Sequence, residues 1–200
     1  MTREPRKPGA TIGIIGGGQL GRMMCQAAAE LGLRTVVLAP DEDAPAAQVC
    51  NRFICTAYND IAGLRALEAA TDVITYEFEN IPADALDTIA ARVLPPVSAL
   101  RISGDRLTEK TFIREQGLPV ADFVDLGDQD ALEDGLAMFG GTGIVKTRRF
   151  GYDGKGQWRI DADTDFRQKS MEMLAQPAIL ERIIPFSREL SVIIARGADG

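Results

Sequence analysis

A short run of branched apolar residues, Thr11 to Ile15, leads directly into three consecutive glycines and then into a helical pattern. Apolar side chains between Leu20 and Leu31 recur at the three- and four-residue spacing of a helix, which Gly32 ends. A buried strand, a tight turn and a helix are therefore predicted here. This unit confines the chain to few folds, because a strand followed by a covering helix builds parallel sheets.

The same alternation continues along the first half of the chain. Further strands are predicted at 34–38, 52–55 and 73–76 and from 93 onward, with helices at 60–70 and 82–91. Strands that alternate with helices predict an α/β fold with a parallel sheet and helices on both of its faces, over residues 11 to about 97.

The pattern changes near residues 98–104, where we place a domain boundary. Asp105 is predicted to cap a long helix that ends at Gln116, before Gly117-Leu118-Pro119. Strands are then predicted near 123 and at 143–147, 157–160, 178–183 and 189–195, and helices at 128–139 and 164–174. The expected organisation is a disordered tail (1–10), a parallel-sheet domain (11–104) and the first part of an α+β domain (105–200).

The absence of histidine and the acidic balance of the chain exclude several function classes. With no histidine, nucleophilic sites that use a histidine base and histidine metal ligands are ruled out. A net charge of −7 argues against general binding to nucleic acid or to an anionic membrane. No apolar run reaches the roughly 20 residues that span a bilayer. The three cysteines have no CxxC spacing, so no disulfide framework or zinc site is predicted.

The first glycine cluster fits a phosphate-binding turn. Gly16, Gly18 and Gly21 follow a strand and open a helix, whose N-terminal amides and dipole favour anions. Asp41 lies about 20 residues further on, where dinucleotide-binding domains place a ribose-binding carboxylate. A nicotinamide or flavin site, a phosphate site for another ligand, and glycines that serve packing alone all remain open from this motif. Gln19 could offer an amide to a ligand.

A second glycine-rich loop carries a stronger signal. Gly151, Gly154 and Gly156 lie between two predicted strands, so the loop can fold over phosphates and donate backbone amides. Basic residues gather around it at Lys146, Arg148, Arg149, Lys155 and Arg159. Lys146 near a strand end can meet phosphate groups, as a strand lysine does in kinases. The other interpretation is the tip of a charged hairpin.

Four segments together resemble the 5-(carboxyamino)imidazole ribonucleotide synthases of the ATP-grasp superfamily. They are IGIIGGGQLGRM at 12–23, YEFEN at 76–80, DRLTEK at 105–110 and GYDGKGQ at 151–157. The resemblance covers nearly the whole chain after Gly9. It implies a Rossmann-like (pre-ATP-grasp) domain followed by the first part of an ATP-grasp domain.

The resemblance also implies an activity and its site residues. Members join ATP, bicarbonate and 5-aminoimidazole ribonucleotide into the carboxylated nucleotide, ADP and phosphate. The implied ATP contacts are Arg106 and Lys146 at the phosphates, the lid loop Gly151, Tyr152, Asp153, Gly154, Lys155, Gly156 and Gln157, the adenine segment Glu181, Arg182, Ile183 and Ile184, and Glu189 at the ribose. The implied ribonucleotide contacts are Gly18, Gln19, Leu20, Glu77, Tyr152 and Asp153, with the first glycine turn at the phosphate.

Family members bind Mg²⁺ through acidic residues expected after residue 200, so the chain by itself is expected to be inactive. A cytoplasmic location and a homodimer of the full-length protein are also implied, without nucleic-acid or membrane partners. The alternatives are a formate-dependent glycinamide ribonucleotide transformylase, a nicotinamide oxidoreductase that uses the first glycine turn, and a binding or scaffold protein.

Overall fold

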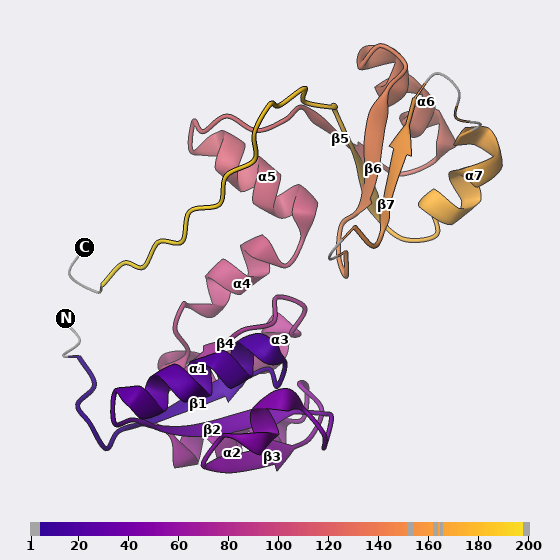
Figure 1. Cartoon of the computed structure of the whole chain (residues 1–200). Helices are drawn as coiled ribbons and strands as arrows, with labels where there is room; N and C mark the ends of the chain where they lie inside the picture. The colour runs from indigo at the N-terminus through magenta and orange to yellow at the C-terminus, as the bar shows by residue number, and fades with distance from the viewer. Residues whose placement is uncertain (1–4, 152–153, 162–163, 165, 198–200) are drawn as a thin grey trace. The chain divides into compact units, whose positions relative to one another are not determined.

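The computed structural model describes residues 5–151, 154–161, 164 and 166–197 (Figure 1). Contacts divide the chain into two units: residues up to Arg101 together with those from Ile194, and Ile102–Ile193. The division falls a few residues before the boundary predicted at 104/105. Over the described residues, no helix is both long and apolar enough to cross a membrane.

The first unit is built on a parallel sheet, as the alternation predicts. Its strands are β1 (Thr11–Ile15), β2 (Arg34–Ala39), β3 (Arg52–Cys55) and β4 (Val73–Tyr76), in the order β3-β2-β1-β4. All of these neighbours pair in parallel. The connecting helices include α1 (Gln19–Glu30) and α2 (Ile61–Ala70), with η1 (Pro45–Gln48) as a short 3₁₀ turn.

Alternate residues of the central strands are buried on opposite faces of this sheet. On one face Ile14 and Val37 pack with Cys25 of α1. On the other face Ile15 packs with Leu64 of α2. The period of two along each strand thus gives both faces an apolar core, and helices cover both, as predicted.

The end of the first unit is less regular than predicted. In place of one helix at 82–91, a short α3 (Ala83–Leu86) tightens into the 3₁₀ helix η2 (Asp87–Arg92), as helix ends often do. The strand predicted from Val93 is a single bridge from Val93 to Ile74. Pro95 and Pro96 have no N–H and cannot continue the ladder. The helix α4 (Val97–Ser103) was not predicted.

The N-terminal lead-in, for which a disordered tail was predicted, makes hydrogen bonds to the first unit over its described part. The Gly9 N–H donates to the Gly32 carbonyl at 2.7 Å. A guanidinium nitrogen of Arg6 donates to the Asp72 carbonyl at 3.0 Å. The tail was predicted from its proline-rich, non-periodic composition, and composition does not reveal hydrogen bonds of this kind to distant residues.

The second unit holds an antiparallel sheet flanked by helices. Its elements are α5 (Arg106–Glu115), β5 (Phe123–Leu126), α6 (Gln129–Met138), β6 (Gly143–Thr147), β7 (Gln157–Ile160), α7 (Phe166–Met173) and β8 (Ala178–Glu181). The strand order is β5-β8-β6-β7, and each neighbouring pair is antiparallel. Leu132 and Leu136 of α6 and Met173 of α7 form one apolar core with Val145 and Leu180 of the sheet.

The strand predicted at 189–195 is wrong. Residues 182–197 are described without helix or strand, and Leu190, Val192 and Ile194 are exposed. A β-strand exists only where a neighbouring strand accepts its backbone hydrogen bonds, and none of the described strands pairs with this segment. The β-branched apolar residues of this segment favour a strand, but they do not provide the neighbouring strand that it would have to pair with.

Candidate functional site

In the first unit, the glycine turn and Glu77 meet at the carboxyl end of the sheet. The Gly18 N–H donates to Glu77 Oε1 at 3.1 Å. Gly16 has a φ of +118°, and a Cβ at this position would lie 2.6 Å from Glu77 Cγ. At Gly21 a Cβ would lie 2.6 Å from the Gly16 carbonyl oxygen. Glycine is required at both positions, because a side chain at Gly16 would collide with the Glu77 carboxylate and one at Gly21 would collide with the backbone of the turn.

The Glu77 carboxylate therefore occupies the position where an anion meets the N-terminus of α1. Gln19 is the first residue of α1 and is exposed, and Leu20 is 58% exposed. Both predicted ligand residues thus lie on the accessible start of this helix, beside the Gly18–Glu77 hydrogen bond.

In the second unit, strand alternation brings Lys146 and Glu181 to the same face of the sheet. Leu180 pairs with Val145, and both are in the apolar core, so their neighbours along the strands point to the opposite face. Glu181 lies opposite Ile144, and Lys146 is two residues further along β6. Diagonal neighbours of this kind are within reach of long side chains.

The Glu181 carboxylate is shared by two lysines. Lys110 pairs with one of its oxygens and Lys146 with the other. Glu181 is only 5% exposed. Burial raises the pKa of the Glu181 carboxyl, but the hydrogen bonds and charges of the two lysines lower it by more, so that its pKa lies below the ordinary value.

Helix α5 presents a stripe of basic side chains to this face. Of these residues, only Arg106 was predicted to bind ATP. Arg106, Lys110 and Arg114 are spaced by four residues and so share one side of the helix. Arg106 Nε donates to the Thr147 carbonyl at 3.3 Å, and Arg114 lies 4.0 Å from the centre of the Phe123 ring. The i, i+4 spacing was the available signal for Lys110.

The glycine-rich loop is closed at its root by Thr147. The Thr147 N–H donates to the Gly156 carbonyl at 2.9 Å. A Cβ on Gly151 would lie 3.0 Å from Thr147 Oγ1 and 3.4 Å from a guanidinium nitrogen of Arg106. Arg106, Lys146 and the loop glycines are thus brought together, as predicted. Lys155 and Gln157 are exposed, while Tyr152 and Asp153 lie outside the described residues.

Two glycines of this loop make a matched test of its geometry. Gly154 and Gly156 both have positive φ, at +81° and +67°. A Cβ on Gly156 would lie 2.4 Å from Thr147 Oγ1, whereas nothing lies within 4 Å of one on Gly154. Gly154→Ala should lower the free energy of unfolding by about 1 kcal/mol and Gly156→Ala by about 2–4 kcal/mol. Urea unfolding followed by Trp158 fluorescence measures both, and equal losses would contradict the close packing at Gly156.

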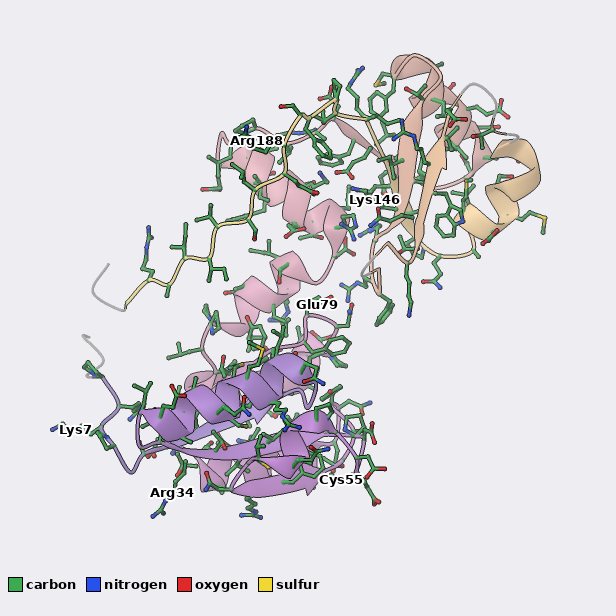
Figure 2. All side chains as sticks on the ribbon, in the orientation of Figure 1. Lys7, Arg34, Cys55, Glu79, Lys146 and Arg188 are labelled. Carbon is green, nitrogen blue, oxygen red and sulfur yellow. The ribbon has the colours of Figure 1, made fainter. Side chains whose placement is uncertain are left out.

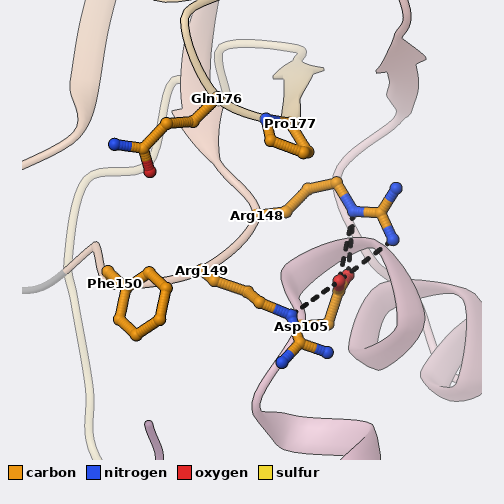
Figure 3. Close-up of a pocket in the computed structure, with 6 residues that line it drawn as sticks. All are labelled: Asp105, Arg148, Arg149, Phe150, Gln176 and Pro177. Atoms are coloured by element: carbon orange, nitrogen blue, oxygen red, sulfur yellow. Dashed lines mark hydrogen bonds and ion pairs between the residues drawn. The ribbon is translucent and has the colours of Figure 1, made fainter.

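Asp105 ties the loop root to the start of α5 (Figure 3). Its carboxylate caps the helix by accepting the Leu107 and Thr108 N–H groups at 3.1 and 3.3 Å. It also accepts three hydrogen bonds of 3.0–3.2 Å from Arg148 and one of 3.3 Å from Arg149. A cavity of about 230 Å³ beside it is lined by Asp105, Arg148, Arg149, Phe150, Gln176 and Pro177. The sequence predicted only the cap.

The second unit should lose stability in acid because of Asp105. Burial raises the pKa of Asp105, but Arg148 and the helix N–H groups lower it by more. The folded state therefore binds fewer protons than the unfolded state, and this stabilisation is complete above the ordinary carboxyl pKa of about 4. This stabilisation is lost as the pH falls through the lowered pKa that Asp105 has in the folded state. Asp105→Asn should flatten the decline in unfolding free energy between about pH 5 and pH 2, and an unchanged slope would contradict this assignment.

The remaining predicted ATP residues follow β8. The Arg182 N–H donates to the Asp122 carbonyl at 2.8 Å, and Arg182 Nε donates to the Asp122 carboxylate at 3.0 Å. Ile183 is half-buried, whereas Ile184 and Glu189 are exposed. The structure does not bring Glu189 into contact with the lysine pair, and its predicted role at a ribose stays a prediction.

Family models and solved structures match both units. A ribonucleotide synthetase preATP-grasp domain matches residues 9–104, and an ATP-grasp domain matches residues 111–200. An N5-carboxyaminoimidazole ribonucleotide synthase of Brucella melitensis is 52% identical over all of this chain and 56% of its own length. The corresponding protein of Staphylococcus saprophyticus is 42% identical, over all of this chain and 54% of its own length.

Among solved structures, N5-carboxyaminoimidazole synthetase from Staphylococcus aureus complexed with ADP matches with a TM-score of 0.87 and 38% identity. The match covers 92% of this chain and 50% of that structure. The chain thus spans about half the length of the curated relatives it matches.

Proposed function

The chain belongs to the N5-carboxyaminoimidazole ribonucleotide synthase family, whose N-terminal portion it matches, and from this premise we propose that it forms the nucleotide-binding part of an ATP-dependent ligase. The reaction proposed for the complete protein carboxylates 5-aminoimidazole ribonucleotide with bicarbonate, in purine biosynthesis. It yields 5-(carboxyamino)imidazole ribonucleotide, ADP and phosphate.

One observation carries this proposal: Arg106 and the glycine-rich loop both meet β6 at Thr147, the residue after Lys146. In the proposed complex, Lys146 and Arg106 contact the ATP phosphates, and backbone amides of the loop cover them. The backbone at 181–184 reads the adenine edge, and Glu189 binds the ribose. These cations and amides orient the phosphates for transfer and stabilise their charge.

The first unit is proposed to bind the ribonucleotide, through the turn at 18–20 and Glu77. The hydrogen bond between Gly18 and Glu77 supports this part of the proposal, because it brings together two of the residues that are proposed to contact the ribonucleotide. Tyr152 and Asp153 are proposed to contact the same ligand from the loop.

Mg²⁺ is proposed to accompany ATP. No three His, Cys, Asp or Glu side chains of the described ranges form a group that could hold a metal ion. The described residues therefore do not fit the role of metal ligands. A homodimer and a cytoplasmic location are extended to the complete protein as predictions, which sedimentation and cell fractionation test.

The substrate is tested by ADP release from the complete protein. ATP should be consumed with 5-aminoimidazole ribonucleotide and bicarbonate, and omission of either should abolish ADP formation. ADP formed instead with glycinamide ribonucleotide and formate would favour the transformylase. Tight NADH binding with no ATP binding would favour an oxidoreductase.

A further inference from the structure

Three charged side chains of the second unit, Lys110, Lys146 and Glu181, form one cluster. Glu181 is buried, and the side chains of Lys110 and Lys146 are only 15% and 19% exposed. One carboxylate is shared by two ammonium groups. Glu109 also interacts with Lys110, Glu181 and Arg106, and with Glu109 and Arg106 counted the five side chains carry one net positive charge. A buried carboxylate must keep a counter-charge, because leaving it unpaired is strongly destabilising.

The two lysines differ in what surrounds them. Lys146 is followed by Thr147, which contacts both Arg106 and the root of the glycine-rich loop. Lys110 projects from α5, and its ammonium lies 5.8 Å from the centre of the Phe123 ring. Lys146 therefore adjoins the loop, whereas Lys110 is held between the carboxylate and an aromatic ring.

We propose that Lys110 is a positioning residue that keeps Glu181 paired, so that Lys146 can turn its charge to the phosphates of ATP. The inference rests on the ATP site of the proposed function. With Lys146 alone, the Glu181 carboxylate would neutralise the ammonium and compete with the phosphate for it. With Lys110 present, Lys146 can move away from Glu181 while the buried carboxylate keeps its ion pair with Lys110.

This division of labour predicts a specific pattern of rescue. Lys110→Met should weaken ATP binding by about tenfold, the scale of one charge-assisted contact. The reason is that Lys146 must then remain paired with Glu181 and is less available to the phosphates. Adding Glu181→Gln to that variant should restore most of the affinity, because the competing charge is gone. Glu181→Gln alone removes the competing charge but keeps the backbone at this position, so it should tighten ATP binding. Lys110→Arg keeps the pair with Glu181 and should remain close to the unmodified protein.

The measurement is the Kd for ATP of the complete protein, by calorimetry, together with KM for ATP and kcat. Lys7→Met is the matched control, since Lys7 is an exposed lysine of the first unit (Figure 2). The Lys110→Met effect should appear in Kd and KM, with kcat little changed.

Several outcomes separate the two proposals. ATP binding that is unchanged in Lys110→Met, or a loss that Glu181→Gln does not repair, overturns the role of Lys110 alone. An unmodified protein that fails to bind ATP overturns the proposed function and this inference with it. If Lys110→Met does not fold, Glu181→Gln alone still decides, because weaker ATP binding in that variant contradicts the competition.

Discussion

Replacing Lys146 with alanine should weaken ATP binding by about 1.5–3 kcal/mol, roughly 10- to 100-fold in Kd. The side chain supplies a charge beside the glycine-rich loop, and no neutral residue replaces a charge-assisted contact with a phosphate. Folding should be little affected, because Glu181 keeps its pair with Lys110. Calorimetric titration with ATP measures the loss.

Two comparisons make the Lys146→Ala result specific. Lys146→Arg keeps the charge and should retain most of the affinity, whereas Lys7→Met removes an exposed lysine of the first unit and should change nothing. Unchanged ATP affinity in Lys146→Ala would show that this lysine only balances Glu181.

Asp105→Ala should destabilise the second unit about as strongly as Gly156→Ala, for a different reason. It removes the cap of α5, worth about 1 kcal/mol, and the charged hydrogen bonds of Arg148, worth about 1.5–3 kcal/mol. Arg149 adds little, because its side chain is 59% exposed. The expected loss in unfolding free energy is about 2–4 kcal/mol. Urea unfolding followed by the fluorescence of Trp158, the one tryptophan of the chain, measures it.

Asp128 offers a matched control for that experiment. It caps α6 by accepting the Ala131 N–H at 2.9 Å, and its carboxylate is exposed. Asp128→Ala should therefore cost only about 1 kcal/mol, the value of a cap. Equal losses at the two positions would mean that the arginines contribute nothing to stability.

The sequence predicted those features that depend on local pattern. The parallel sheet follows from the alternation of strands and helices, since apolar residues on both faces of a strand require a helix on each side. Glu77 was assigned to the ribonucleotide through the family resemblance, and the structure places it beside the glycine turn because the parallel strands β1 and β4 end at the same edge of the sheet. Neither prediction needs knowledge of distant contacts.

Features that depend on pairing could not be predicted in the same way. The segment at 189–195 has the composition of a strand, but composition does not supply the neighbour that a strand needs. Glu181 was assigned through its backbone, whereas its side chain binds two lysines from other elements. Lys110 was missed because a basic stripe on a helix does not reveal which surface that side of the helix contacts.

The strand order of the second unit has a consequence for how the protein is made. β8 lies between β5 and β6, although it follows both in the chain. Before Ala178–Glu181 leaves the ribosome, those two strands have no common partner, and the sheet remains open. Long-range pairings of this kind form slowly and late. The carboxylate that pairs with the two lysines lies at the end of β8, so the charge cluster requires that β8 has already paired between β5 and β6.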